Sequence, residues 1–232
     1  MITLTALLVG AALAPNIEDY TQKNLKDATF VAKKVRATQR ELQKINDDFG
    51  MSYRFDSIKF SYKEPFNLRA EAKVEETSAP YIINGTSQVF RVPRLKVNTK
   101  LNLAHAPGRR QTPLDFGVLT PALFDGFMNA KFVRLDRATG AQVFDLTYAG
   151  DDDSSRHRVW VDPEKGITIR REWYNQPGTQ LATFFYENPE KVNGVWVPTR
   201  MTVKNTDDKV AGITEYSSIK INQGLPDSLF EL

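Results

Sequence analysis

The stretch "NGVWVPTRMTVKN", residues 193–205, reads as a turn followed by a strand that carries two unusual residues. Asn193-Gly194 supplies the turn, because both residues accept positive φ angles at little cost. Pro198 cannot donate a hydrogen bond to a neighbouring strand, so it belongs at an edge or a bulge, where a sheet bends or stops. We expect Trp196 to fill or cover the space at that bend. The stretch therefore predicts a strongly curved sheet.

Strand-like alternation continues through most of the chain. In "FNLRAEAKVEE", which begins at Phe66, apolar residues face one way and polar or charged residues the other. "YIINGTSQVF" is a hairpin around Asn84-Gly85. After Ala130, glycine-containing turns separate "AQVFDLTY", "RHRVWVD", "ITIRREWY", "QLATFFYE" and "VWVPTRMTVKN", and a last strand ends at Ile221. About ten strands in a meander of antiparallel hairpins predict a mainly β (α+β) fold with one domain over residues 15–232.

Two segments have a different pattern. Residues 16–49 carry apolar residues three or four apart, with Asn16 as a helix cap, and predict one long amphipathic helix that covers the sheet. Residues 98–129 are rich in Pro and Gly, and Thr120-Pro121 is typical of the start of a short helix that reaches Phe127. Segments of this length without strands are often functional or mobile.

A curved sheet with one apolar face has to close into a barrel or curl around helices. One long helix and one short insert would fill it incompletely, which predicts a cavity for an apolar ligand. The expected lining consists of apolar side chains: Val31, Val35, Leu42, Phe66, Leu68, Ala70, Phe124, Phe127, Phe144, Leu146 and Trp196. Arg109 and Arg110 are candidates for contact with an anionic headgroup, and an ordinary polar loop is the alternative.

The N-terminal run "MITLTALLVGAALAPN" has no charged side chain and contains Ala12-Leu13-Ala14. It predicts a signal peptide or anchor over residues 1–14, and therefore a periplasmic or otherwise extracytoplasmic protein. A buried N-terminal helix or strand is the alternative. The net charge of +3 is spread along the chain and does not indicate a nucleic-acid partner. The absence of cysteine excludes thiol nucleophiles and cysteine-type zinc sites.

Groups that carry chemistry are sparse. His105 and His157 have no nucleophile elbow near them and form no metal-binding motif, so we expect no catalysis, no cofactor and no metal. A hydrolase is a third reading that would need one of these histidines. The acidic run 151–153 lacks the spaced oxygens of a calcium loop and predicts a solvated hairpin tip.

The C-terminal part of the chain resembles LolA-type outer-membrane lipoprotein carrier and sorting proteins. The resemblance rests on Gly194, Trp196 and Pro198, and on the ending "NQGLPDSLFEL" from Asn222. The turn "WVDPEKG" at residues 160–166 also resembles the middle of that family. Residues 63–129 depart from the family pattern and would replace its mobile helical lid.

The resemblance implies an unclosed antiparallel β-barrel with helices over its opening. It also implies a monomeric carrier at the cell envelope that binds lipid or lipoprotein acyl chains in an apolar cavity, without chemistry. Its partners would be lipids or lipidated proteins, and envelope membrane proteins that deliver or receive them. The alternative is a module of the same fold that senses a lipid or a partner protein. The resemblance does not identify the lipid or the partner.

Overall fold

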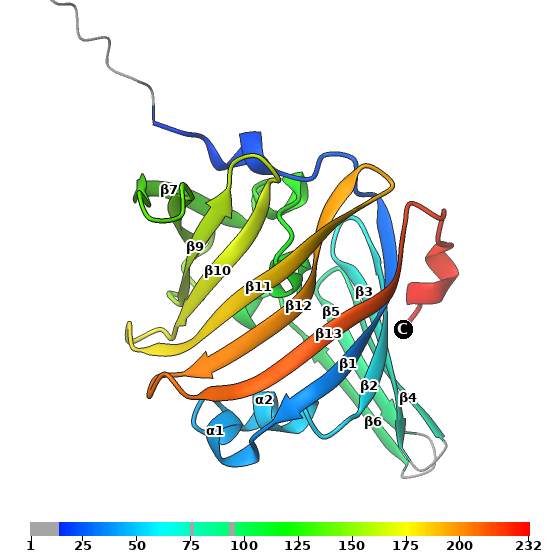
Figure 1. Ribbon diagram of the computed structural model, residues 1–232. Helices are drawn as coiled ribbons and strands as arrows, with labels where there is room; N and C mark the ends of the chain where they lie inside the picture. The colour runs from blue at the N-terminus through cyan, green and yellow to red at the C-terminus, as the bar shows by residue number, and fades with distance from the viewer. Residues whose placement is uncertain (1–13, 75–76, 93–95) are drawn as a thin grey trace, which may run out of the picture.

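A single antiparallel sheet dominates the computed structural model, which describes residues 14–74, 77–92 and 96–232 (Figure 1). Its 13 strands lie in the order β6-β5-β4-β3-β2-β1-β13-β12-β11-β10-β9-β8-β7. Strands that neighbour each other in the sheet are consecutive in the chain, except β1 and β13. A mainly β, unclosed antiparallel sheet is thereby confirmed. The N-terminal run expected to be a signal peptide or anchor lies outside the described residues, apart from Ala14.

The sheet has two halves that meet where β1 pairs with β13. The first half is β1 (Asp27–Ala37), β2 (Ser57–Lys63), β3 (Asn67–Val74), β4 (Thr77–Asn84), β5 (Ser87–Val92) and β6 (Val97–Asn102). The second half is β7 (Met128–Leu135), β8 (Gln142–Tyr148), β9 (Arg156–Asp162), β10 (Ile167–Tyr174), β11 (Gln180–Val192), β12 (Val195–Asn205) and β13 (Val210–Ile221). The free edges are therefore β6 and β7.

The irregular stretch in β12 lies against an equally irregular stretch of β11. Pro198 faces Pro189, so two residues without an N–H group oppose each other, and the adjacent Asn188 has a φ of 51°. Val195 and Val197 point into the core, which places Trp196 on the outer face. There its ring lies between the ammonium groups of Lys165 and Lys191, at 5.9 and 5.8 Å. Trp196 covers the sheet from outside.

The prediction of one long helix over residues 16–49 is wrong. The segment forms the one-turn 3₁₀-helix η1 (Ile17–Tyr20), strand β1, and the short helices α1 (Gln39–Gln43) and α2 (Asp47–Ser52). Asn16 does cap a helix, because its Oδ1 accepts a hydrogen bond from the N–H of Glu18 at 3.2 Å, but that helix is η1. Register shifts on β1 against β13 disturb the two-residue alternation, so its apolar residues mimic helical spacing. Pairing with β2 and β13 outweighs the weak local preference.

The helical elements between β1 and β7 are short and lie at one end of the sheet or inside its curve. Helices α1 and α2 connect β1 to β2 and cover one end, where Leu42 and Ile45 are buried in the core. The predicted helix after Thr120 is a single 3₁₀ turn, η5 (Pro121–Leu123), preceded by η3 (Pro107–Arg109) and η4 (Pro113–Phe116).

No helix in the described ranges is long and apolar enough to cross a membrane.

The C-terminal residues bind to the outer side of the first half-sheet. The buried carboxylate of Asp27 accepts hydrogen bonds from the N–H groups of Gln223, Gly224 and Leu225, at 2.7, 2.9 and 3.3 Å. The chain then forms η6 (Asp227–Phe230), whose Phe230 is buried. The ending that resembles the carrier family therefore holds the fold together in this protein.

Candidate functional site

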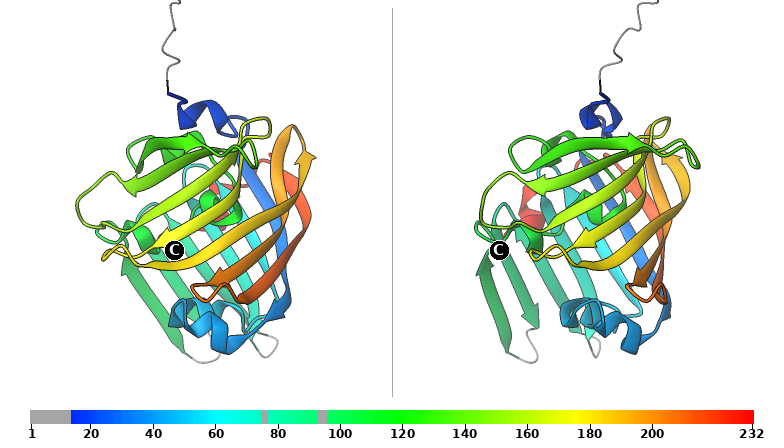
Figure 2. Two further views of the ribbon diagram at one scale, coloured as in Figure 1. Left: turned by 60° about the vertical axis from the view of Figure 1, so that its left-hand side comes forward. Right: turned by 90° about the vertical axis from the view of Figure 1, so that its left-hand side faces the viewer.

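The connection between the two half-sheets passes through the concave side of the sheet. We call residues 103–127 the covering segment, which contains η3, η4 and η5 (Figure 2). Helix η4 starts at Thr112, whose N–H donates to Asp115 Oδ2 at 2.9 Å, and ends at Gly117, which has a φ of 77°. This local bond and the left-handed glycine keep η4 to a single turn.

Phe116 projects from η4 into the centre of the sheet. Its ring makes edge-to-face contacts with Phe30, Phe60 and Tyr216, with centroid distances of 4.9, 5.0 and 6.0 Å. These partners come from β1, β2 and β13, where the two halves of the sheet join. Phe116 and Tyr216 both border each of the two cavities described next, so these two rings form their shared wall.

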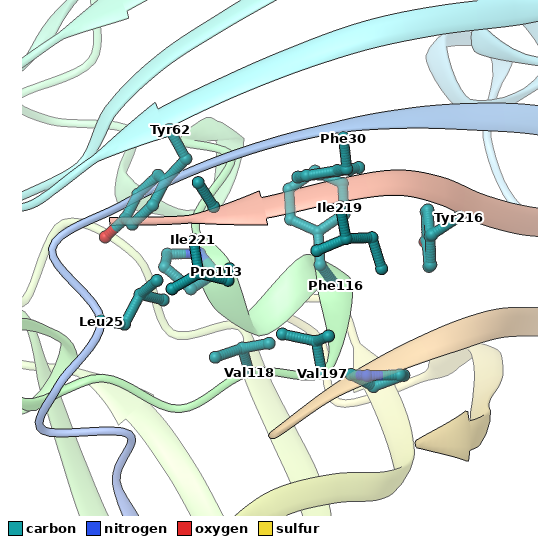
Figure 3. A pocket seen from close by; sticks show the side chains of 12 residues that line it. Leu25, Phe30, Tyr62, Pro113, Phe116, Val118, Val197, Tyr216, Ile219 and Ile221 are labelled. Carbon is teal, nitrogen blue, oxygen red and sulfur yellow. The ribbon is translucent and has the colours of Figure 1, made fainter. Parts of the chain in front are cut away.

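The first cavity, called the apolar cavity, has a volume of about 50 Å³ (Figure 3). Its lining is Leu25, Ala28, Phe30, Tyr62, Pro113, Phe116, Val118, Val197, Pro198, Tyr216, Ile219 and Ile221. In the view of Figure 3, Tyr62 and Leu25 lie at one end and Tyr216 at the other, with Phe116 between them. A water molecule needs roughly 10–15 Å³ by this measure, so the cavity is far too small for an acyl chain as it stands.

The second cavity, called the mixed cavity, has a volume of about 140 Å³ and lies between Phe116 and the α1–α2 end of the sheet. Its lining is Ala32, Lys34, Phe49, Tyr53, Phe55, Ile58, Phe60, Gln111, Asp115, Phe116, Arg171, Phe184, Met201, Thr214 and Tyr216. Aromatic rings form much of its wall, and a few charged and polar groups converge on it. Such a combination is typical of sites that bind an amphipathic molecule.

An ion pair fixes the covering segment to the sheet beside the mixed cavity. Arg171 Nη1 on β10 donates to Asp115 Oδ1 at 2.9 Å, and the Arg171 side chain is only 6% exposed. Tyr186 Oη on β11 donates to the carbonyl oxygens of Leu114 and Asp115, at 3.1 and 3.3 Å. Burial lowers the pKa of Arg171, but nearby Tyr186 and Asp115 outweigh burial and raise it overall. Arg171 therefore stays charged inside the sheet.

His157 on β9 is buried beside this ion pair. Its Nε2 lies 3.4 Å from Tyr148 Oη, and its Nδ1 has no partner among the described residues. Burial and, second, the charge of Arg171 hold the pKa of His157 well below its usual value, so the ring is neutral. His105 is exposed and pairs with Asp152 at 3.1 Å. In the described part of the chain, neither histidine is hydrogen-bonded to a serine hydroxyl.

The acidic run 151–153 is built into a turn. Asp153 accepts hydrogen bonds from the N–H groups of Gly108 and Ser155, at 3.0 and 2.9 Å, which ties the turn to the covering segment. Among the described residues, no group of three or more acidic, histidine or cysteine side chains could hold a metal ion.

The residues expected to line a cavity are distributed over several places. Leu42, Leu68 and Ala70 belong to the core cluster that surrounds the cavities, and Phe66, Phe124, Phe127, Phe144 and Leu146 to a second cluster beneath η5. Val35 is 49% exposed, and Val31 pairs on the outward-facing side of β1 with Lys59 and Ser217. Of the described residues that line the two cavities, none was among those expected from sequence.

The two arginines of the covering segment differ in environment. Arg109 is exposed, whereas Arg110 is half-buried with its guanidinium 4.4 Å from the centre of the Phe66 ring. Arg110 Nε, Tyr62 Oη, Glu64 Oε1 and Thr120 Oγ1 are buried with no hydrogen-bond partner in the described part of the structure. Burial raises the pKa of Glu64, against the opposing effect of the Thr120 and Tyr62 hydroxyls.

The residues that organise the site were absent from the sequence-based prediction. Thr112-Pro113 with Asp115 is a helix-start signature that could have placed η4. Arg171 could have been found as a charge on the inner side of β10, because Trp173, two residues further along the strand, packs against the core. Phe116 carries no such signal, since its position depends on how the covering segment folds back.

Comparisons with solved structures identify the fold. A structure described as an outer membrane lipoprotein-sorting protein domain, from Vibrio parahaemolyticus, has a TM-score of 0.62 at 12% identity, over 93% of each chain. A LolA superfamily protein from Nitrosomonas europaea has a TM-score of 0.59 at 17% identity, over 93% of this chain and 94% of that one. A DUF1329 family protein from Desulfovibrio piger has a TM-score of 0.56 at 12% identity, over 93% of this chain and 92% of that one.

A protein family described as "Uncharacterized protein" matches residues 129–232, which comprise nearly all of the second half-sheet and the C-terminal residues after β13. No curated protein sequence matches the chain. The resemblance to the LolA type is confirmed at the level of fold, and the chain has a LolA-like fold.

Proposed function

We propose that this protein is an extracytoplasmic carrier that binds lipid or lipoprotein acyl chains inside its curved sheet and catalyses no reaction. One observation carries the proposal: the interior holds two cavities that share a wall, formed by Phe116 of the covering segment and Tyr216 of β13. The LolA-like fold supports it, since one solved structure of this fold is described as a lipoprotein-sorting domain. The uncharged N-terminal run supports the location outside the cytoplasm.

The closed interior has to open before a chain can enter. Movement of η4 would withdraw Phe116 and join the apolar and mixed cavities, which both border this ring. Leu42, Leu68 and Ala70 in the surrounding core cluster are then available as additional lining. Arg109 on the covering segment is exposed and available for contact with a headgroup that stays at the surface, whereas Arg110 would first have to leave the Phe66 ring.

The free-energy difference between the loaded and unloaded forms is expected to be small, as a carrier requires. An acyl chain that leaves water gains about 0.8 kcal/mol for each buried CH₂ group. A chain that leaves a membrane exchanges one apolar surrounding for another, so that gain largely cancels. The remaining balance is set by the contacts of Phe116 and the Arg171–Asp115 ion pair, which are broken on loading and restored on release. Both directions are therefore accessible.

A disulfide that locks the covering segment tests this proposal. Val118 and Ile167 form an antiparallel bridge in which the N–H of Thr168 donates to the Gly117 carbonyl oxygen at 2.9 Å. Residues opposite each other in such a pair have Cβ atoms close enough for a disulfide after small adjustment. The chain has no cysteine, so the double variant Val118→Cys/Ile167→Cys carries only this pair.

The assay is transfer of a pyrene-labelled phospholipid from donor to acceptor vesicles, with native mass spectrometry of the purified protein for bound lipid. We expect transfer by the reduced double variant, none by the oxidised form, and redox-independent transfer by the single variant Val118→Cys. The proposal fails if the wild-type protein neither carries lipid nor transfers it. Equal transfer by the oxidised and reduced forms would show that the covering segment does not gate the interior.

A further inference from the structure

We propose that the ligand is a single-chain amphiphile with a carboxylate head, and that Asp115 and Phe116 occupy its place in the closed form. The inference rests on the proposed function and assigns the chemical class of the ligand. Its head would bind Arg171 in the mixed cavity, and its chain would take the place of the Phe116 ring and extend into the apolar cavity.

The covering segment already presents this chemistry to the sheet. Asp115 places a carboxylate on Arg171 at 2.9 Å, and the next residue places an apolar ring among Phe30, Phe60 and Tyr216. A carboxylate followed by an apolar body is the composition of a fatty acid. A bound fatty acid could therefore satisfy the partners of both side chains when η4 withdraws.

The guanidinium of Arg171 is only partly satisfied by its partner. Arg171 Nη1 binds Asp115 Oδ1, whereas Arg171 Nε is buried and has no hydrogen-bond partner among the described residues. Asp115 cannot readily take both positions, because its Oδ2 already accepts the N–H of Thr112 at 2.9 Å. A carboxylate without that tie can accept two parallel hydrogen bonds from a guanidinium, which is the stronger arrangement. The site thus holds a spare donor for an external carboxylate.

The charge of the cavity wall also favours an anion. Lys34 and Arg171 line the mixed cavity, and Asp115 is the only acidic side chain among the described residues that line it. Lys34 has its own partner, Asp56, at 2.8 Å at the surface. When Asp115 leaves with η4, Arg171 remains as a buried cation with no acidic partner in the cavity wall, and burial of an unpaired charge is strongly unfavourable. A neutral ligand would leave that cost in place, and a carboxylate would remove it.

The test compares dodecanoate with methyl dodecanoate, which have the same chain and differ in head charge. Each displaces the neutral fluorescent probe N-phenyl-1-naphthylamine from the wild-type protein, from Asp115→Asn and from a control, Asp162→Asn. Asp162 is also an acidic residue that accepts backbone N–H groups, from Glu164 and Lys165, and it lines neither cavity. Thermal unfolding of each variant verifies that it is folded.

We expect the wild-type protein to bind dodecanoate at least tenfold more tightly than the ester. Asp115→Asn removes the ion pair that loading has to break, so its affinity for dodecanoate should rise at least tenfold, its affinity for the ester should rise as well, and its preference for the acid should be retained. Asp162→Asn should behave as wild type. Equal affinity of the wild-type protein for acid and ester would overturn the assignment of the head while leaving the carrier function intact, and this comparison does not depend on any variant. Failure of every ligand to displace the probe would overturn the carrier function as well.

Discussion

Replacement of Phe116 by alanine is the most direct perturbation of the divided interior. The ring touches Phe30, Phe60 and Tyr216. Of the residues of η4, all of which the structure describes, Asp115 and Phe116 border the mixed cavity. Because the ring borders both cavities, we expect its removal to join them. We therefore expect a less stable closed form and easier entry of apolar ligands.

The size of the effect follows from the contacts. Removal of a fully buried Phe side chain costs about 3–5 kcal/mol. Phe116 is half-buried and already borders empty space, so about 2–3 kcal/mol is the expected loss. For a domain of this size, that lowers the melting temperature by about 4–12 °C. A ligand that must displace the ring no longer has to break these contacts, so its apparent affinity rises about 30-fold or more.

Two measurements on the same samples check this prediction: thermal unfolding followed by circular dichroism, and titration with N-phenyl-1-naphthylamine. Phe127→Ala is the matched control, because Phe127 is a half-buried residue of the same covering segment that packs on Phe66 and Tyr148. It lines neither cavity. The control should lose similar stability without any gain in probe affinity.

A specific pattern of results would refute the reasoning. If Phe116→Ala loses stability but binds the probe no better than Phe127→Ala, the ring does not stand in the path of a ligand. If both variants gain affinity equally, general loosening of the covering segment explains the binding, and the division of the interior by Phe116 has no functional role.

Three further predictions concern stability. Burial and, second, Arg171 lower the pKa of His157, so its contribution to the free energy of unfolding is fully present above about pH 6.5 and falls below it, by at most about 1.4 kcal/mol per pH unit. In urea unfolding, the free energy of unfolding of His157→Leu should therefore fall less steeply as the pH is lowered below about 6.5. An equally steep fall in the variant would contradict the assignment. Asp27→Ala removes the acceptor of the N–H groups of residues 223–225 and should lower the free energy of unfolding by about 3–4 kcal/mol, with faster amide exchange at these residues. Asp27→Asn should lose an intermediate amount of stability. An alanine variant as stable as wild type would rule out that role. Gly117→Ala must adopt a φ of 77° and would place a Cβ 2.6 Å from the ring of Tyr186, so we expect a loss of at least about 2 kcal/mol by thermal unfolding, and no loss would mean that η4 is not held against the sheet.

The second half of the fold follows closely from local sequence. The predicted strands "RHRVWVD", "ITIRREWY" and "VWVPTRMTVKN" have the bounds of β9, β10 and β12. Glycines with positive φ, such as Gly166 and Gly194, mark the turns between strands, and alternation gives the faces. Local signals suffice there because consecutive strands pair with each other.

The first strand and the site could not be obtained in this way. β1 pairs with β13 across nearly the whole chain, so its conformation is decided by a distant partner rather than by its own spacing of apolar residues. The cavities depend on the same kind of information, because their lining combines β1, β2 and β13 with a segment that folds back inside the sheet. The sequence predicted an underfilled interior and an unusual segment between residues 98 and 129, but not which side chains meet there.

The central place of β13 has a consequence for how the protein is made. Strands β1 to β6 can pair among themselves, as can β7 to β12, but the strand that unites these two blocks is synthesised after all the others. Until then β1 and β12 each present an open ladder of backbone groups, which is the condition that invites mispairing and aggregation. β13 completes the sheet by pairing with both β1 and β12. Nascent chains stalled before Val210 should therefore depend on chaperones far more than the finished protein.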